Sequence, residues 1–345
     1  MIKTYEVMLK ILAIGDPHFR TKYIKTIDQF IQQTIDLVKA LTTDMVVVLG
    51  DTLHHHERTD SECHVRAIKW FKSLSTITKL VVLIGNHDRR NNSDFQTEYH
   101  FFTGLTEHKN IWIVDKATSL SLVIGQMKHR LVFVPYVPPQ RFQEALDTLE
   151  TNITDNVPTV IFAHQEFKGA KMGAIISEIG DEWDLNNPLV ISGHLHECQT
   201  PQENIFYCGT PYQTTYSEDA NKGVYLFTFK NSKTPEIKRV KLNLRVKSSV
   251  TIAPNELNDF VLPNSNMDLR IIVVGKHEEV EALKSSKKYN ELRKQPNISI
   301  VLRPQLEFKS IPKIYQKSYK QVLFEDIKDN PILKQIYVEV LGDIQ

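Results

Sequence analysis

Residues 80–88 of this chain read Leu-Val-Val-Leu-Ile-Gly-Asn-His-Asp, an apolar run that ends in glycine and then in three polar residues. Such a continuous apolar run is typical of a strand that is buried on both faces of a sheet. The glycine lets the chain turn sharply where the strand ends. The amide, imidazole and carboxylate that follow can bind metal ions or carry protons. This stretch therefore predicts a buried strand with a functional site at its carboxyl end.

Four other apolar runs end in the same kinds of side chain. They lead, in chain order, to the segments Gly15-Asp16-Pro17-His18, Gly50-Asp51, His164 and Gly193-His194-Leu195-His196. Ligand sites in α/β sheets form at the carboxyl ends of strands. In Asp16-x-His18 and His194-x-His196 the paired side chains lie two residues apart, so on extended backbone they face the same side. We therefore expect these residues to converge on one site.

Helical patterns separate these runs. Apolar residues spaced three or four apart from Ile24 to Val38 predict an amphipathic helix, and residues 60–74 and 94–105 each open with a capping residue and also predict helices. The predicted strands are 9–14, 45–49, 80–84, 131–134, 159–163, 189–192, 204–208, 224–229 and 237–242. Alternating strands and helices predict an α/β layered domain.

A change in composition near Lys247–Pro263, which is rich in Ser, Asn and Pro, predicts a domain boundary. Beyond it, strands at 269–274 and 298–302 and a helix from about residue 277 to 288 predict a small α/β cap. The tail from 319 to 341 fits two short helices interrupted by Pro331. The predicted division is therefore 1–245 for the larger domain, 246–312 for the cap and 313–345 for a helical tail.

The overall charge of +1 hides an asymmetry between the two parts of the chain. Residues 230–320 carry 19 Lys and Arg against 9 Asp and Glu, whereas residues 1–229 carry 21 against 27. The basic part can hold a polyanion and the acidic part can hold cations, although lysine-rich surfaces are also common for solubility. No apolar run is long enough to cross a bilayer, and the three cysteines form no CxxC pair. These features predict an intracellular protein that is not embedded in a membrane.

The residue types at the strand ends indicate which metals would bind. Carboxylate, imidazole and amide oxygen together favour Mn²⁺, Fe or Zn²⁺, and Cys is absent from the set. Taken singly, each motif is more often a turn, a helix cap or a satisfied core histidine than a ligand. Five such motifs, each at the end of an apolar strand, nevertheless predict a metal centre.

The complete series of motifs resembles the signature of calcineurin-like metallophosphoesterases over about residues 9–230. The resemblance implies a four-layer fold, in which two sheets are flanked by helices, and two divalent metal ions that Asp51 bridges. It implies that the first ion is also held by Asp16, His18 and His196, and the second by Asn86, His164 and His194. In that family two adjacent ions make a hydroxide available to attack phosphorus. His87 would then contact the scissile phosphate, and Asp88 would orient the ring of His87.

Local features resemble the SbcD-type DNA repair nucleases in particular. Gly50-Asp51 is followed three residues later by His54, which by this resemblance contacts the phosphodiester; His55 and His56 are expected to be loop residues. The segment 207–218 contains Gly-Thr-Pro and ends in Ser-Glu, as in that family, and residues 164–167 resemble phage and viral members. One departure is Phe19-Arg20, where many members have Leu-Gly.

This resemblance implies a Mn²⁺-dependent nuclease of repair, recombination or replication, with 3′–5′ exonuclease activity on duplex ends and endonuclease activity on single strands. It also implies an SbcC-type coiled-coil ATPase partner, bound by residues of about 315–341, and a homodimer formed through helices near 60–76 and 95–105. One alternative is a phosphomonoesterase or small nucleotide phosphodiesterase, against which the basic residues 230–320 argue. The other is a non-catalytic DNA-binding scaffold, against which the complete ligand set argues.

Overall fold

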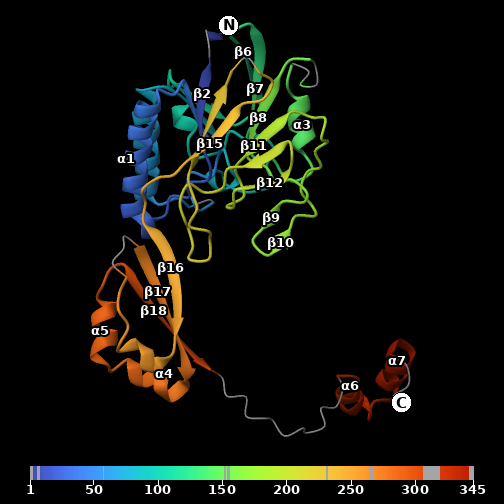
Figure 1. The fold of residues 1–345 in the computed structure, drawn as a ribbon. Coiled ribbons are helices and arrows are strands. Elements are labelled where there is room, and N and C mark those ends of the chain that lie inside the picture. Colours follow the sequence, from blue (N-terminus) through green and yellow to red (C-terminus); the bar gives the residue numbers. More distant parts are fainter. Residues whose placement is uncertain are drawn as a thin grey trace. The chain divides into compact units, whose positions relative to one another are not determined.

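The computed structural model describes residues 3–5, 8–56, 58–150, 153, 156–230, 232–263, 267–305 and 319–341 (Figure 1). One sheet has six strands in the order β15-β14-β2-β3-β4-β5. Its strands are β2 (Leu9–Ile14), β3 (Met45–Val48), β4 (Lys79–Leu83), β5 (Ile111–Val114), β14 (Val224–Phe229) and β15 (Glu236–Val240). Strands β2 to β5 run parallel, so their carboxyl ends lie at one edge of the sheet.

A second sheet has seven strands in the order β1-β6-β7-β8-β11-β13-β12. They are β1 (Lys3–Tyr5), β6 (Thr118–Ile124), β7 (Met127–Val134), β8 (Thr159–Ala163), β11 (Leu189–Ser192), β12 (Gln199–Gln202) and β13 (Ile205–Tyr207). The central strands β7, β8, β11 and β13 are parallel to one another. A small hairpin, β9 (Lys171–Met172) and β10 (Ile175–Ile176), follows β8.

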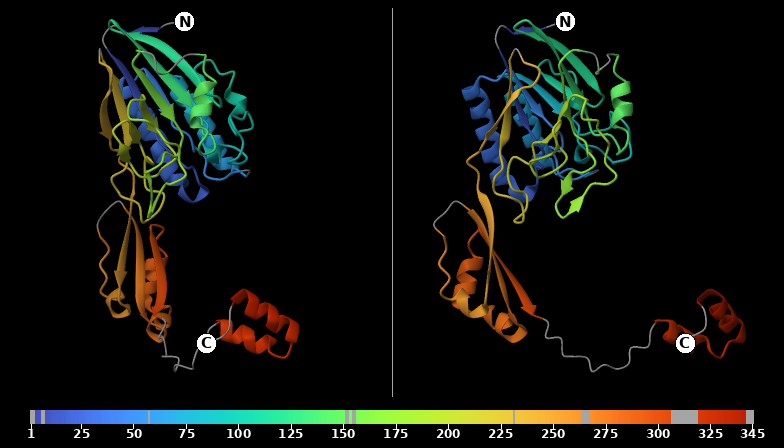
Figure 2. Two further views of the ribbon diagram at one scale, coloured as in Figure 1. Left: turned by 90° about the vertical axis from the view of Figure 1, so that its right-hand side faces the viewer. Right: turned by 45° about the vertical axis from the view of Figure 1, so that its right-hand side comes forward.

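Three separate hydrophobic clusters show that the two sheets and their helices form four layers. One cluster joins the six-stranded sheet to α1 (Ile24–Leu41) and α2 (Ser61–Ser75), the next fills the space between the sheets, and the third joins the seven-stranded sheet to α3 (Phe142–Asp147). Within β2, Leu12 and Ile14 pack toward the helices while Ile11 and Ala13 pack toward the other sheet. Figures 1 and 2 show this arrangement, which confirms the predicted four-layer α/β fold.

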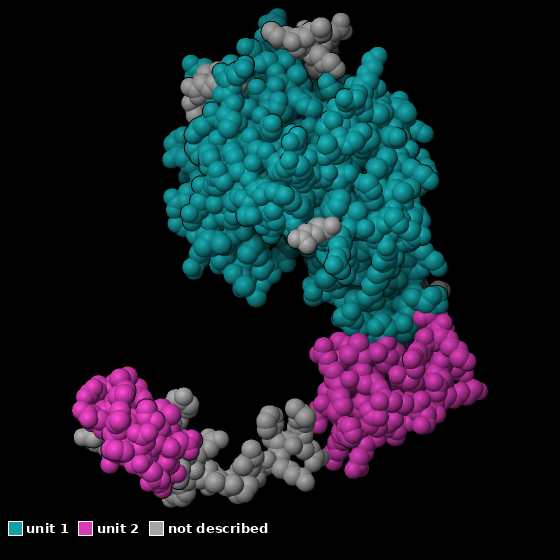
Figure 3. Space-filling view, turned by 180° about the vertical axis from the view of Figure 1, so that it is seen from behind, with its two compact units in different colours: residues 1–250, 262–271, 296–299 teal, residues 251–261, 272–295, 300–345 magenta. Residues whose placement is uncertain are grey.

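The chain divides into two compact units (Figure 3): residues 1–250, 262–271 and 296–299 form one, and residues 251–261, 272–295 and 300–345 form the other. A three-stranded sheet has the order β16-β17-β18. The elements after β15 are β16 (Val246–Ile252), β17 (Met267–Lys276), α4 (His277–Leu283), α5 (Lys287–Arg293), β18 (Ile298–Gln305), α6 (Tyr319–Ile327) and α7 (Pro331–Leu341). Residues 306–318 of the predicted cap and tail lie outside the described residues.

The tail contains the two expected short helices, and the second begins at Pro331, a residue favoured at the start of a helix. The rings of Phe324 and Tyr337 pack 5.5 Å apart, and the Tyr337 hydroxyl donates to the Lys320 carbonyl at 2.9 Å, so α6 and α7 form a hairpin. In the part of the chain that the structure describes, no helix is both long and apolar enough to span a bilayer.

Two predicted helices differ from the structure. The helix expected from 277 to 288 is divided into α4 and α5 because the Ser286 hydroxyl accepts the backbone N–H of Tyr289 and starts a new helix. The helix expected over 94–105 is wrong: apart from a single turn at Thr103–Leu105 the segment is irregular. The buried Arg89 guanidinium donates to the Asp94 carbonyl, so this carbonyl is not available for the first turn of that helix.

Candidate metal centre

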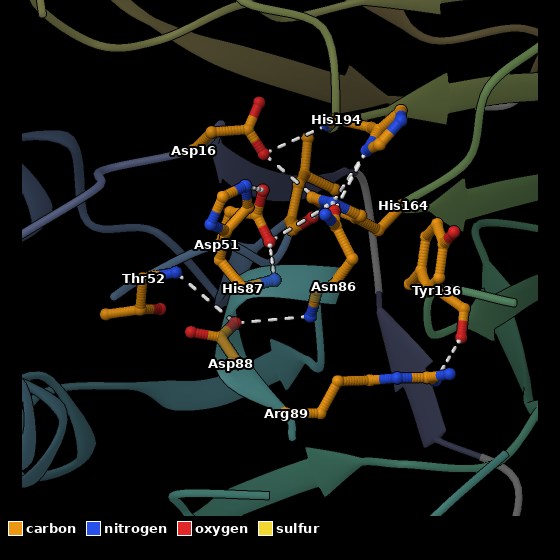
Figure 4. Close-up of polar contacts among 12 residues, drawn as sticks. Asp16, Asp51, Thr52, Asn86, His87, Asp88, Arg89, Tyr136, His164 and His194 are labelled. Atoms are coloured by element: carbon orange, nitrogen blue, oxygen red, sulfur yellow. Dashed lines mark hydrogen bonds and ion pairs between the residues drawn. The ribbon is translucent and has the colours of Figure 1, made fainter. Parts of the chain in front are cut away.

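The predicted ligands meet where strands of the two sheets end side by side. Asp16 follows β2, Asp51 follows β3 and Asn86 follows β4, all in the six-stranded sheet. His164 follows β8, and His194 and His196 follow β11, in the seven-stranded sheet. In Figure 4 the side chains of Asp16, Asp51, Asn86, His164 and His194 gather at one place from these loops. The structure therefore brings together the residues that the sequence selected, including His18, which is buried beside Asp51.

The backbone at this site adopts conformations that are costly for residues with side chains. In the described part of the chain six non-glycine residues have positive φ, and three of them are here: His18 (45°), Asp51 (47°) and His194 (78°). Such conformations cost on the order of 1–3 kcal/mol each and cluster at functional sites. They are held by hydrogen bonds from the His18 amide to the Asp51 carbonyl, 2.9 Å, and from the His194 amide to the Asp16 carboxylate, 3.0 Å.

Glycine is needed at Gly85 because the chain passes directly against Asp51. A Cβ placed on Gly85 would collide with the carboxylate and the amide nitrogen of Asp51. The same close approach lets the His87 amide donate to Asp51 Oδ1 at 2.8 Å. The tight packing of residues 85–87 on Asp51 fixes the direction of that carboxylate.

One group of ligand atoms surrounds His164. Its Nε2 lies 3.1 Å from Asn86 Oδ1, 3.3 Å from His194 Nδ1 and 3.4 Å from Asp51 Oδ1. Its Nδ1 contacts the Leu49 carbonyl at 2.6 Å, and because a carbonyl only accepts, Nδ1 carries the proton of the neutral ring. The Nε2 lone pair is therefore directed at the same point as the other three atoms.

A second group surrounds His18 on the other side of Asp51. His18 Nε2 lies 2.9 Å from His196 Nε2 and 3.8 Å from Asp51 Oδ2. The ligand atoms of His18, His54 and His87 also lie within 4.8 Å of one another. His54 and His87, which the resemblance leaves outside the ligand set, thus stand close to His18, and Asp16 Oδ1 lies 3.4 Å from His164 Nδ1.

These residues fit a pair of divalent cations. Asp51 directs Oδ1 toward the His164 group and Oδ2 toward the His18 group, as a bridging carboxylate must. Asp16 Oδ2 is buried and has no hydrogen-bond partner among the described residues, although an unpartnered buried carboxylate oxygen is costly. Burial holds the pKa of His18 well below its usual value, so the ring is neutral, as a metal ligand must be. Divalent cations at this site would give the Asp51 oxygens, Asp16 Oδ2 and the neutral His18 ring a partner.

Charge is concentrated on the pair formed by Asp51 and His164. Burial alone would raise the pKa of Asp51, but the charge of His164 and the hydrogen bond to it hold this pKa well below its usual range. Burial opposes protonation of His164, yet the Asp51 and Asp16 carboxylates raise the pKa of His164 to about 9. Without cations, a proton on His164 therefore balances the buried carboxylates.

Two glutamates behind the ligand histidines were not selected from the sequence. His194 Nε2 lies 3.8 Å from Glu166 Oε2, and His196 Nδ1 lies 3.5 Å from Glu218 Oε1. Burial opposes ionisation of Glu218, but hydrogen bonds to His196 and Thr214 lower its pKa to about 2. Carboxylates in this position fix the orientation of a ligand histidine and make it more basic. Glu166 and Glu218 lie in the segments 164–167 and 207–218, which resemble those of the nucleases. This resemblance is the signal in the sequence that could have identified the two glutamates.

Asp88 does not orient the His87 ring as expected. Its carboxylate accepts the backbone N–H groups of Thr52, Leu53 and Gly85 at 3.0–3.3 Å, and burial together with the neighbouring Asp51 charge raises the pKa of Asp88 to about 7. The His87 ring instead places Nδ1 2.7 Å from the His54 carbonyl. The Asp88 side chain does not reach the His87 ring because its carboxylate binds backbone N–H groups of both loops. These hydrogen bonds hold the loop after β3 against the loop after β4.

His56, which was expected to be an ordinary loop residue, lies against His87. The two rings stack with centroids 4.2 Å apart and planes inclined by 28°. The His54 ring lies nearly parallel to the His87 ring at 5.7 Å. His55 is exposed and its ring contacts only that of His54 among the described rings. Three imidazoles are therefore stacked or aligned beside the candidate metal positions.

Comparison with known proteins places this geometry in context. The family model described as calcineurin-like phosphoesterase matches residues 9–198, which include every predicted metal ligand. "Putative phosphoesterase 244L" of Invertebrate iridescent virus 6 is 38% identical over 283 residues, covering 81% of this chain and 98% of that protein. "Putative phosphoesterase 078R" of Invertebrate iridescent virus 3 is 33% identical over 331 residues, covering 94% of this chain and 93% of that protein.

Among solved structures, a dimetal phosphatase from Danio rerio resembles the chain with a TM-score of 0.43 and 12% identity, covering 69% of this chain and 100% of that one.

Proposed function

Because the chain belongs to the calcineurin-like phosphoesterase family, and is thus a phosphoester hydrolase with candidate sites for metal ions, we propose that it is a Mn²⁺-dependent nuclease that cleaves phosphodiester bonds of DNA. One observation carries the hydrolase chemistry: the two oxygens of Asp51 face two separate groups of ligand atoms. Divalent cations bound there would provide Lewis acidity and an activated water near neutral pH.

His87 is the residue best placed to handle a proton on the leaving group. Because the His54 carbonyl accepts from Nδ1, the neutral ring leaves Nε2 as an acceptor, and Nε2 lies 3.9 Å from Asp51 Oδ2. The side chain is 27% exposed, so a substrate can reach it. After protonation, Nε2–H can donate to a phosphate oxygen or to the departing oxygen.

His54 supports a diester rather than a monoester substrate. The His54 ring lies next to that of His87 and adds a second imidazole beside the candidate metal positions. Burial together with the nearby Arg20 charge lowers the pKa of His54 to about 4, so the ring is neutral. A neutral imidazole can donate a hydrogen bond to a diester without adding the positive charge that a dianionic monoester would favour.

The basic C-terminal part supports a polyanionic substrate. Residues 230–320 carry a net charge of +10 from 19 basic and 9 acidic residues. On α5 and just after it, Arg293 and Lys294 are exposed, and neither takes part in an ion pair among the described residues. Such side chains bind the phosphates of nucleic acids, whereas a small phosphomonoester needs no extended basic surface.

The test is a parallel assay of the full chain with Mn²⁺ on end-labelled single-stranded and duplex DNA, bis-p-nitrophenyl phosphate and p-nitrophenyl phosphate. We expect metal-dependent cleavage of DNA and of the diester, with weak activity on the monoester. Asp51→Asn is the control for contaminating nuclease, because it removes the bridging carboxylate and should abolish every activity. Rapid monoester hydrolysis with intact DNA would favour the phosphomonoesterase alternative. Two bound metal ions without any turnover would favour a scaffold.

The α6–α7 hairpin supports the proposal of a protein partner, for which the resemblance suggests a coiled-coil ATPase. Ile332, Ile336 and Val340 lie four residues apart on α7 and are 69%, 50% and 72% exposed. They form one apolar stripe on the helix. The test is co-purification of the full chain with a co-expressed SbcC-type coiled-coil ATPase, which Ile336→Glu should abolish and the exposed-site control Gln335→Glu should not.

Pairing of two copies stays a prediction. The irregular structure of residues 95–102 removes one of the two helices that were expected to form the interface, so α2 is the remaining element. Val65 on α2 is 47% exposed. Light scattering of the wild type and of Val65→Glu tests whether a homodimer forms through α2. A monomeric wild type would exclude the homodimer.

A further inference from the structure

An open hollow is lined in part by the residues that directly follow Asn86 and His87. It has a volume of about 480 Å³, and its lining includes Asp88, Arg89, Arg90, Glu98, Tyr99 and His100. A second hollow of about 340 Å³ shares Arg90, Glu98 and Tyr99. Tyr99 therefore stands between two hollows, in the segment that replaces the expected helix.

The Tyr99 ring is available for stacking. Tyr99 is 61% exposed, and among the described Phe, Trp and Tyr residues no other is exposed. The Arg90 guanidinium lies 5.1 Å from the ring centroid. An exposed aromatic ring beside an arginine is a platform on which a flat, electron-rich ring can stack. A nucleobase has this shape, and single-stranded DNA presents its bases unpaired.

The charges of the hollow argue against a phosphate as its ligand. The Arg89 guanidinium donates to the carbonyls of Asn91, Asp94 and Tyr136, and it is 1% exposed. Arg90 is paired with the Asp94 carboxylate at 2.8 Å. The Glu98 carboxylate, which takes part in no ion pair among the described residues, adds an acceptor that would repel a phosphate. A neutral ring that bears amino groups suits this lining better.

The hollow is connected to the metal centre by a single short segment. Asn86 and His87 face the cation groups, and Asp88, Arg89 and Arg90 line the hollow. Four residues of extended chain span at most about 14 Å. At the 3.4 Å rise per nucleotide of one stacked DNA strand, this reach corresponds to about four nucleotides or fewer. A strand whose phosphodiester lies at the metal centre is therefore long enough to place one of its bases in the hollow.

We propose that this hollow is a base-binding subsite, in which a nucleobase of single-stranded DNA, close to the scissile phosphate, stacks on Tyr99. The inference rests on the proposed nuclease function and adds a substrate preference to it. A fully paired duplex keeps its bases stacked inside the helix, so the subsite selects single strands and frayed ends. A small diester that ends at its own leaving group does not reach Tyr99.

The experiment compares wild type, Tyr99→Ala and Tyr99→Phe, the last of which keeps the stacking ring and loses only the hydroxyl. Loss of one base–aromatic contact weakens single-strand binding by roughly 5- to 100-fold. We expect the KM for a single-stranded oligonucleotide to rise by that factor in Tyr99→Ala and to stay unchanged in Tyr99→Phe. The kinetics with bis-p-nitrophenyl phosphate should be the same in all three proteins, which also shows that each is folded and active.

A binding measurement separates this inference from the nuclease proposal. A 2-aminopurine placed near the scissile position should lose fluorescence on stacking in wild type and Tyr99→Phe but not in Tyr99→Ala. Equal KM values and equal quenching in wild type and Tyr99→Ala would overturn the subsite, whatever the cleavage activity. Quenching without cleavage of any DNA would keep the subsite and overturn the nuclease. A change of oligomeric state in Tyr99→Ala, with KM unaffected, would assign Tyr99 to a protein interface instead.

Discussion

His87 Nδ1 lies 2.7 Å from the carbonyl oxygen of His54, so the loop after β3 fixes the ring that follows β4. This contact leaves Nε2 facing the candidate metal positions. We predict that His87→Gln retains its metal ions, because the substitution leaves the seven ligands implied by the resemblance in place, but loses turnover by about 10²–10⁴-fold, the usual effect of removing a general acid–base group. Metal analysis together with kcat on bis-p-nitrophenyl phosphate checks this. Near-normal kcat would remove His87 from the reaction.

The stack of His56 on His87 gives a second prediction. His56→Ala should lower kcat by roughly tenfold, because a misplaced catalytic group loses rate steeply, and His56→Phe, which keeps a flat ring, should restore most of it. His55→Ala is the matched control, since His55 is exposed and contacts His54 rather than His87. If both alanine variants behave alike, the stack has no role in positioning.

Glu218 should tune metal affinity without touching a metal. Its Oε1 lies 3.5 Å from His196 Nδ1, and Lys222 holds Oε2 at 3.3 Å. Removal of such a carboxylate typically weakens metal binding by about 10- to 100-fold. We therefore expect Glu218→Gln to need that much more Mn²⁺ for half-maximal activity, while the exposed neighbour Glu197→Gln should titrate like wild type. Identical Mn²⁺ titrations in the two variants would contradict this role.

Metal binding should strengthen as the pH rises. The pKa of His164 is raised to about 9 when no cation is present, so below that pH the ring is protonated and must release its proton before Nε2 can bind a metal ion. Each released proton makes the affinity rise about tenfold per pH unit. Calorimetry in buffers of different ionisation enthalpy measures the proton directly. A Mn²⁺ affinity that is constant from about pH 6 to about pH 8 would show that His164 binds no metal.

The strands that end in ligands could be predicted because their signal is local. Four of the five are apolar runs followed by glycine and a ligand, and the fifth, 159–163, leads directly into His164. The run at 9–14 matches β2 residue for residue. The helix predicted over 94–105 failed because the competing interaction comes from outside the pattern: Arg89 captures the carbonyl of Asp94. The spacing of apolar residues over 94–105 does not show that the buried Arg89 guanidinium binds a backbone carbonyl there.

The outer parts of the site were missed for a similar reason. Glu218 and His196 are separated by 22 positions in the chain, and only the turn between β13 and β14 brings them together. The stack of His56 on His87 depends on how the loop after β3 lies against the loop after β4. The spacing of residues along the chain does not give this arrangement. Residue types at strand ends therefore predict ligands, whereas their partners depend on the tertiary fold.

Asp16, Asp51 and Asn86 belong to one sheet, and His164, His194 and His196 belong to the other. Cations shared by these residues would join the two halves of the sandwich at the edge where their strands end. Removal of the ions with a chelator should consequently increase amide hydrogen exchange in β3 and β8 together, although neither strand contains a ligand. Without the ions, nothing at this edge would oppose sliding of one sheet over the other.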